Sequence, residues 1–366
     1  MGNPLLLAID PGSTSTKFAL YLGEQAIHVE QLHHPEPQIF QYPSVAAQAD
    51  YRLQAIVQNL LSHGFFLDRL DAVVGRGGFL HSVHSGVYRV NEAMVRDLQL
   101  ARYGEHASNL GAILAYTLAD KFHIPAYIVD PIVVDEMADV ARLSGIPELQ
   151  RKSYVHALNV RAVSYLVAQR LNKPLTESSF VVAHLGSGIS VVAMKDGRMV
   201  DVNNANSEGP FAPERAGGLP AYELVKLCYS GHFSEQELLE KITKKGGLYA
   251  YLGAKDIREI EQRMAAGDSL AETVLSGMVY QIAKEIGAMA TALEGRMDGI
   301  ILTGGMAYSE WVVQHLLQKI SFLAPVSVIP GERELDALAQ GILRVLHGKE
   351  QEQSYTAVES AIPLSI

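Results

Sequence analysis

The same pattern occurs twice in this sequence, about half a chain apart, and this repetition constrains the fold more than any other feature. Near the N-terminus, the apolar run LLLAI is followed by DPGSTST and then by a second run, KFALYL. From residue 180 the chain again has an apolar run, a Gly-Ser-Gly turn and another apolar run, FVVAHLGSGISVVAM. Each copy predicts two strands joined by a turn rich in glycine and hydroxyl groups. The repeat therefore predicts two similar α/β domains, each presenting one such turn.

Composition is consistent with two globular domains. The chain has 366 residues, too many for one ordinary core, and 48% of them are apolar against 19% charged. A net charge of −10 disfavours nucleic-acid binding, which needs a basic surface. Cys228 is the single cysteine, which excludes an intramolecular disulfide and fits a reducing compartment. No apolar stretch approaches the roughly 20 residues that span a bilayer. We therefore expect a cytoplasmic protein without a nucleic-acid or membrane partner.

Strands alternate with helices along the chain. The patterns predict strands at 5–9, 17–22, 26–32, 72–74, 180–185, 189–195 and 299–303, and helices at 46–62, 105–122, 154–171 and 270–293. Further strands precede Asp130 and Gly331, and a last helix follows residue 334. Polar residues gather where strands end, which is the edge at which α/β sheets bind ligands. The polar tail after Gly348 is expected to fray.

Three glycine-rich turns offer backbone donors suited to a phosphate chain. The first, at 10–17, carries more hydroxyls than a hairpin needs, and it matches neither the P-loop nor the dinucleotide pattern. The second is HLGSGIS at 184–190, and the third, LTGGM at 302–306, would let the backbone press against a flat nucleoside. Each alone also fits an ordinary turn, but the three together favour a nucleotide site. Its candidate residues are Ser13, Thr14, Ser15, Lys17, His184, Gly186, Ser187, Gly188, Gly304, Gly305 and Met306.

Eight segments in this order resemble the acetokinase family of the actin-like ATPase superfamily, and within that family the butyrate kinases. They are AIDPGSTSTKFAL, VVGRGGFL, YIVDP, KSYVHALNVRAVS, VVAHLGSGISV, EGPFAPERAGGLP, LTGGMAYSE and VIPGERELDALAQGILRVL. The resemblance implies two actin-like (ribonuclease H-like) α/β domains, with mixed sheets flanked by helices and an ATP cleft between them. It assigns 1–131 plus 335–366 to the N-terminal domain and 132–334 to the second. It also suggests a homo-oligomer, a dimer or larger.

The resemblance further implies reversible phosphoryl transfer from ATP to a short-chain carboxylate, above all butyrate, giving an acyl phosphate and ADP with Mg²⁺. A carboxylate is already ionised at neutral pH, so this reaction needs no general base. It needs positive charge instead, because an anion attacks a polyanion and the moving phosphoryl carries three charged oxygens. Arginine, a histidine donor and a metal ion are suitable for that purpose.

The catalytic residues implied by the family are Arg76, His156, Arg215 and Asp130. Arg76 in VVGRGG would meet the carboxylate and the moving phosphoryl, and Arg215 in APERAGG matches a second family arginine. His156 would donate to the phosphoryl. Taken singly, each of these residues is also typical of a surface, a helix cap or an Asx turn. His106 in YGEHASNLG resembles another family histidine, but the spacing differs and its role stays open.

The candidate metal-binding residues are Asp10, Asp130 and Glu334. Asp10 stands where acetate kinases carry asparagine, and it would hold Mg²⁺ through water. Asp130 matches a family acid that positions the metal. Glu332 and Glu334 flank Arg333, so the sequence leaves open which of them matches the metal-linked glutamate of the family, and Glu334 is preferred.

Other functions fit parts of the pattern. A branched acid such as isobutyrate would need only a differently shaped pocket, and four apolar residues after Arg76 suit either a pocket or a core: Phe79, Leu80, Val83 and Val87. A sugar or polyol kinase would use Asp130 as a base, but Arg76 and Arg215 would then have no evident role. A non-catalytic nucleotide-gated clamp would bind ATP without turnover. The expected ligands are thus ATP or ADP, Mg²⁺ and a small carboxylate.

Overall fold

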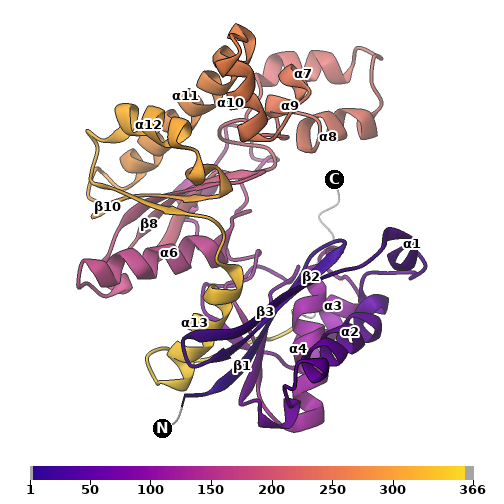
Figure 1. The fold of residues 1–366 in the computed structure, drawn as a ribbon. Helices are drawn as coiled ribbons and strands as arrows, with labels where there is room; N and C mark the ends of the chain where they lie inside the picture. Colours follow the sequence, from indigo (N-terminus) through magenta and orange to yellow (C-terminus); the bar gives the residue numbers. More distant parts are fainter. Residues whose placement is uncertain (1–2, 359–366) are drawn as a thin grey trace. The chain divides into compact units, whose positions relative to one another are not determined.

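The structure, a computed structural model, describes residues 3–358. The chain divides into two compact units, one formed by the residues up to Val134 together with those from Arg333 onward, the other by Asp135–Glu332 (Figure 1). The boundaries expected from the sequence, 131/132 and 334/335, lie within a few residues of this division. That the two units are independent domains stays a prediction.

The first unit is built on a seven-stranded mixed sheet with the order β12-β5-β6-β4-β1-β2-β3. Strands β1, β2 and β3 form an antiparallel meander, and β1 pairs in parallel with β4, which pairs in parallel with β6. The strands are β1 (Leu5–Pro11), β2 (Ser15–Leu22), β3 (Gln25–His33), β4 (Ala72–Arg76), β5 (Val87–Arg89), β6 (Ala126–Val129) and β12 (Gln353–Ser354).

Helices cover both faces of this sheet (Figure 1). One face carries α2 (Ala49–Ser62), α3 (Glu92–Gln99) and α4 (Asn109–Phe122), and the other carries α13 (Glu334–Leu346). Helix α4 begins at Asn109 and not at residue 105 as expected, because a turn precedes it in which the N–H of Asn109 donates to the carbonyl of His106. The short elements are α1 (Glu36–Ile39) and the 3₁₀ turns Ala46–Gln48 and Leu67–Arg69.

Helix α4 crosses β4 where there is no room for a side chain. A Cβ at Gly111 would lie 2.2 Å from the carbonyl oxygen of Arg76, and a Cβ at Gly75 would lie 1.9 Å from the carbonyl oxygen of Gly111. We expect Gly111→Ala to lower the free energy of unfolding by about 1–3 kcal/mol, because the helix must move off the strand. Urea denaturation measures this effect. Gly145→Ala is the control, since a Cβ there meets nothing within 4 Å. Equal midpoints for the two variants would contradict the prediction.

The second unit repeats the strand arrangement of the first. Its five-stranded sheet has the order β11-β10-β7-β8-β9, in which β7, β8 and β9 form an antiparallel meander and β7 pairs in parallel with β10. The strands are β7 (Phe180–Leu185), β8 (Ile189–Lys195), β9 (Arg198–Val202), β10 (Gly299–Gly304) and β11 (Val326–Pro330). The sequence repeat thus corresponds to two equivalent hairpins, β1–β2 and β7–β8, and the predicted fold class is confirmed.

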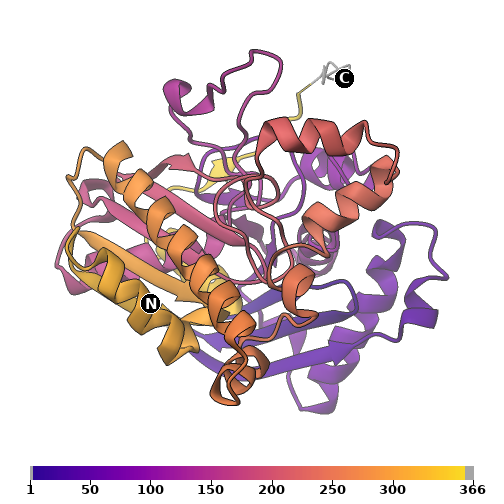
Figure 2. The same cartoon turned by 90° about the horizontal axis from the view of Figure 1, so that it is seen from above.

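The helices of the second unit also lie on both sides of its sheet. Helix α6 (Ala157–Arg170) packs on one face, while α11 (Ser269–Ala292) and α12 (Glu310–Ile320) lie side by side over the other (Figure 2). The predicted stripe of α11, including Met278, Ile282 and Ile286, is buried in this core. The remaining elements are α5 (Asp139–Arg142), α7 (Ala221–Cys228), α8 (Glu235–Thr243), α9 (Gly247–Leu252), α10 (Ile257–Ala265) and 3₁₀ turns at Leu175–Glu177 and Gly305–Tyr308.

The C-terminal segment corrects one expectation. Gln353–Ser354 forms β12, which pairs with β5, and Tyr355 is buried with its hydroxyl donating to Asp97 at 2.8 Å. The polar tail is therefore ordered to at least this point because it completes the sheet edge, while residues 359–366 lie outside the described part of the chain. Within residues 3–358, no helix has both the length and the apolar character needed to cross a membrane.

Candidate active site

The first glycine-rich loop connects β1 to β2. Asp10 and Lys17 face each other across the ladder at the base of the loop, and Ser13 and Thr14 are exposed at its tip. Ser15 is half-buried at the start of β2. The hydroxyl and amide groups of this loop are thus accessible to a ligand, while the strands that support it are buried.

Three predicted residues of the first unit meet at one point. Arg76, the last residue of β4, places Nη1 3.1 Å from Asp10 Oδ1 and 2.6 Å from Glu334 Oε1. Asp10 comes from β1 and Glu334 from the first turn of α13, so three elements converge here. The strand predicted at 72–74 continues through Arg76, because the pairing with β6 extends to this residue.

Asp10 and Glu334 carry carboxylate oxygens, the kind of ligand that a magnesium ion prefers. Mg²⁺ at phosphate-transfer sites is held by one or two carboxylates, with waters and substrate phosphates completing the shell. Within residues 3–358, no group of three or more histidine, cysteine or acidic side chains lies close enough to hold a metal ion without a ligand. A two-carboxylate site completed by phosphate oxygens agrees with that donor set.

Asp130 is more constrained than the sequence indicated. It follows β6 with a φ of +39°, is 3% exposed, and accepts a hydrogen bond through Oδ1 from the backbone N–H of Gly86 at 2.7 Å. Its own N–H donates to the Gly86 carbonyl at 2.9 Å. The two reciprocal bonds tie the end of β6 to the approach to β5, so the carboxylate has a structural partner.

His106 lies in the electrostatic field of the Arg76 cluster. Although the ring is exposed, desolvation by its neighbours and the charge of Arg76 lower the pKa of His106, and Asp10 opposes them. Its Nδ1 accepts from the backbone N–H of Ser108 at 3.2 Å, so Nε2 carries the proton of the neutral ring. Phe79 packs edge-on against this ring at 5.7 Å between centroids. Of the four apolar residues after Arg76, Leu80 and Val87 belong to the core.

Two histidines of the second unit stack beside the second glycine turn. The rings of His156 and His184 are 3.9 Å apart and nearly parallel, and His156 Nδ1 lies 3.0 Å from Ser190 Oγ. His184 Nε2 points toward the turn, because a Cβ at Gly186 would lie 3.0 Å from it. Glu332 Oε1 lies 3.2 Å from the same nitrogen.

Asn159 fixes the orientation of His184 and was missed by sequence reasoning. Its side-chain Nδ2 donates to His184 Nδ1 at 2.9 Å and to Thr303 Oγ1 at 3.1 Å. Thr303 Oγ1 in turn donates to the carbonyl of Gly331, which identifies the amide nitrogen of Asn159 as the donor. With Nδ1 accepting, the proton of neutral His184 lies on Nε2, facing the turn. The available signal was the spacing, because Asn159 lies one helical turn after His156.

Arg215 lies directly against the second glycine turn. A Cβ at Gly188 would meet Nη1 of Arg215 at 2.3 Å, so only glycine leaves room for the guanidinium. Nη1 donates to the carbonyl of Ala205 at 3.3 Å, and burial lowers the pKa of Arg215. The structure thus brings together Arg215, His184, His156 and the Gly-Ser-Gly turn, which the sequence indicated separately.

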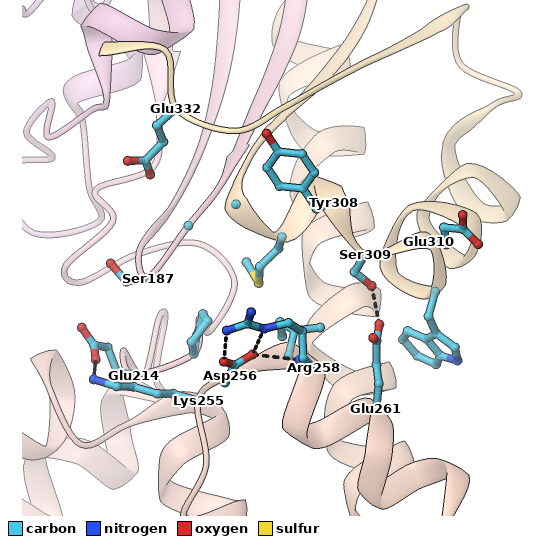
Figure 3. Close-up of a pocket in the computed structure, with 16 residues that line it drawn as sticks. Ser187, Glu214, Lys255, Asp256, Arg258, Glu261, Tyr308, Ser309, Glu310 and Glu332 are labelled. Carbon is cyan, nitrogen blue, oxygen red and sulfur yellow. Dashed lines mark hydrogen bonds and ion pairs between the residues drawn. The ribbon is translucent and has the colours of Figure 1, made fainter. Parts of the chain in front are cut away.

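The second and third glycine turns open into one cavity of about 1190 Å³ (Figure 3). Gly186 and Ser187 line it from one side, and Gly305 and Met306 from another. A Cβ at Gly305 would meet nothing within 4 Å, so this glycine faces open space. By contrast, Gly304 has a φ of +89° and packs against the Leu185 carbonyl. Gly305, not Gly304, therefore allows close approach of a ligand.

The opposite wall of this cavity comes from residues that the sequence did not indicate. Asp256 caps α10 by accepting from the N–H of Arg258 at 2.9 Å, and it also pairs with the Arg258 guanidinium at 2.6 Å (Figure 3). Ser309 donates to Glu261 on the same side. The only local signal was an aspartate at a helix start, which is too common to mark a site.

The fold and the cavity define a nucleotide-binding protein of the actin-like ATPase class. The acetokinase family model matches residues 128–328. Butyrate kinase 2 of Clostridium acetobutylicum is 47% identical over 351 residues, covering 96% of this chain and 99% of that relative. A probable butyrate kinase 2 of Caldanaerobacter subterraneus is 49% identical over 350 residues with the same coverage. The chain therefore belongs to the acetokinase family, as its motifs predict.

Solved structures show the same fold. An acetate kinase from Porphyromonas gingivalis superposes with a TM-score of 0.76 at 19% identity, covering 94% of this chain and 100% of that one. A propionate kinase from Francisella tularensis gives a TM-score of 0.72 at 18% identity, covering 92% and 98%. These likenesses confirm the predicted two-domain, actin-like architecture.

Proposed function

We propose that this chain transfers the γ-phosphoryl group of ATP to butyrate, reversibly and by direct in-line displacement, giving butyryl phosphate and ADP. Its family makes it a phosphotransferase with a carboxyl group as acceptor. The observation that carries the proposal is the group of Arg215, His156 and His184 around one glycine turn that lines a nucleotide-sized cavity. These groups supply positive charge and hydrogen-bond donors, which phosphoryl transfer to a carboxylate needs.

The cavity of the second unit would hold the adenosine. The loop at 10–17 of the first unit is a candidate for contacts to phosphate oxygens. Arg76 would bind the substrate carboxylate and the moving phosphoryl, while Arg215 and His156 would stabilise the charge that develops on it. His184 would donate from Nε2 to a phosphate oxygen. Asp10 and Glu334 would hold Mg²⁺, and Asp130 would help to position it. When bound, the ion would neutralise phosphate charge.

Asp130 favours a carboxylate kinase over a sugar kinase. A base for a hydroxyl substrate must accept a proton from it, but the Asp130 carboxylate is buried and bonded to the Gly86 N–H. The structural role of Asp130 is therefore better suited to a metal-positioning acid than to a catalytic base.

Hydroxylamine trapping of acyl phosphate with Mg-ATP tests the reaction. Acetate, propionate, butyrate, isobutyrate and a sugar are offered in parallel. We expect hydroxamate from butyrate and less from acetate. A higher yield from isobutyrate would assign a branched-acid kinase. ADP released only with the sugar would overturn the proposal in favour of hydroxyl chemistry, and ATP binding without any turnover would favour a nucleotide-gated clamp.

Asn159→Leu is expected to lower kcat by about 10- to 100-fold, the usual cost of losing a group that orients a functional histidine. Without the Asn159 donor, the Nε2 proton of His184 is no longer held toward the glycine turn. Steady-state assays with a thermal melt measure the effect. Thr303→Val is the matched control, because it removes the other partner of Asn159 and leaves the contact with His184. Equal kcat values for Asn159→Leu and the wild type would refute the role.

We also propose that the enzyme works in the cytoplasm as a homo-oligomer. Cys228 is a free, exposed thiol, which suits a reducing compartment. Helix α7 exposes large apolar side chains at Tyr222 and Val225, with Tyr229 just beyond it, and an interface with a second copy would cover them. Light scattering of the purified chain tests this proposal, and a monomeric mass at micromolar concentration would contradict it.

A further inference from the structure

A buried arginine lies beneath the loop that connects β1 and β2. Arg52, in the first turn of α2, is 1% exposed. Within the described residues, no carboxylate lies within ion-pair distance of its guanidinium, whereas buried charges are usually paired. The proposed mechanism does not use this residue, so its placement calls for a physical explanation.

The guanidinium binds carbonyl groups of the loop. Nη1 donates to the carbonyls of Gly12 at 2.8 Å and Ser15 at 2.9 Å, and Nη2 donates to that of Ser13 at 2.8 Å. The remaining carbonyl, of Thr14, accepts from the backbone N–H of His34 at 2.8 Å. The carbonyls of Gly12, Ser13 and Ser15 are therefore directed at the buried guanidinium, while that of Thr14 is bonded to the residue that follows β3.

Turning the carbonyls inward directs N–H groups outward. In a trans peptide the C=O and the following N–H point in opposite directions. The inward carbonyls of Gly12 and Ser13 therefore direct the N–H groups of Ser13 and Thr14 away from Arg52. These two N–H groups have no acceptor anywhere in residues 3–358. Adjacent outward N–H groups form the concave anion site found at many phosphate-binding loops.

The positive charge beneath the loop is not neutralised. Burial lowers the pKa of Arg52 to about 10, which leaves the guanidinium charged at neutral pH. Its other partners are uncharged, because Nε and Nη2 donate to Gln48 Oε1 at 3.1 and 2.8 Å and Nη1 to Thr16 Oγ1 at 3.2 Å. His34 Nε2 lies 2.8 Å from Thr16 Oγ1, and burial together with the Arg52 charge lowers the pKa of His34 to about 4.

We propose that Arg52 is a positioning residue for the phosphates of ATP. It holds the loop with its N–H groups outward and adds a buried positive charge that attracts phosphate without touching it. The inference rests on the proposed role of this loop in binding ATP. In a purely structural role, Arg52 would only stabilise the turn. Its loss would then weaken the binding of charged and uncharged ligands equally.

Two substitutions separate the charge from the geometry. Gln48→Glu keeps the acceptor for Arg52 and places a negative charge beside the guanidinium. Arg52→Met removes the guanidinium with all of its hydrogen bonds. We expect KM for ATP and Kd for ADP to rise about 3- to 10-fold in Gln48→Glu, and about 10- to 100-fold in Arg52→Met, because charge-assisted hydrogen bonds hold the loop. Kd for adenosine, which lacks phosphate, and KM for butyrate should change less than 2-fold.

Gln54→Glu is the matched control, since it makes the same change at an exposed position of α2, the helix that carries Arg52. Calorimetry with ADP and adenosine needs no turnover, so it tests Arg52 even if no acid is phosphorylated. Equal weakening of ADP and adenosine in both variants would overturn the proposal in favour of a structural role. If Arg52→Met does not fold, the Gln48→Glu variant alone tests the proposal. An unchanged Kd for ADP in Gln48→Glu would overturn the proposal.

Discussion

Replacing Arg76 with alanine is expected to lower kcat for butyrate phosphorylation by about 10²- to 10³-fold, the usual cost of removing one preorganised donor from a developing charge. In the structure, the guanidinium lies between Asp10 and Glu334, at 3.1 and 2.6 Å. In the alanine variant the guanidinium no longer offsets the negative charge of these two acids. An anionic substrate would then approach an acidic site, so KM for butyrate should rise as well.

Arg76→Lys is the companion variant. It keeps one positive charge but loses the planar fork, which binds carboxylates and phosphates through two parallel bonds. We expect a kcat between those of the wild type and Arg76→Ala. Because Arg76 is the last residue of β4 and partly exposed, the far-UV circular dichroism of both variants should match the wild type. A correctly folded Arg76→Ala enzyme with wild-type rates would remove this residue from the site.

Arg215→Ala is expected to cause a loss of similar size, about 10²-fold or more in kcat, for a different reason. Arg215 lies against the Gly-Ser-Gly turn, and its guanidinium donates one hydrogen bond to the Ala205 carbonyl. Its charge is thus available to the phosphoryl group in transit. The expected loss should appear in both directions of the reaction, because both pass through the same transition state.

Gly188→Ala provides a matched test for Arg215. The added Cβ would meet Nη1 at 2.3 Å and displace the guanidinium without deleting it. We expect a smaller loss of kcat than in Arg215→Ala, and little further loss when the two substitutions are combined, since they act on one group. Assays at saturating Mg-ATP and butyrate measure both effects. Full additivity of the two losses would show that Gly188 acts through something other than Arg215.

Much of the fold could be predicted from local patterns. The two hairpins β1–β2 and β7–β8 follow from alternating apolar runs around glycine turns, and helix α11 follows from one buried stripe. Errors occurred where a local signal was overridden. Pairing with β6 extended β4 through Arg76, and a turn closed by the Asn109 N–H and the His106 carbonyl delayed the start of α4. The tail formed β12 because an unpaired sheet edge was available to it.

Candidate site residues beside glycine could be proposed from the sequence, whereas those defined only by distant contacts could not. Arg52 supports Gly12, 40 residues away, and Asn159 contacts Thr303, 144 residues away. An arginine or an asparagine on a helix carries no local mark of such a role. Asp256 and Arg258 were missed for the same reason, since they face the nucleotide-sized cavity only after α10 has packed.

The sequence by itself determined the family, the two repeated hairpins, the main core helices and the three glycine turns, because these depend on residues close together in the chain. Only the tertiary structure separated Glu332 from Glu334. Glu334 begins α13 and pairs with Arg76 in the first unit, whereas Glu332 lies beside His184 in the second. These two glutamates are two residues apart in sequence, but the chain passes from one unit to the other between them. They belong to different clusters because the packing of each unit sets the direction of its own side chains.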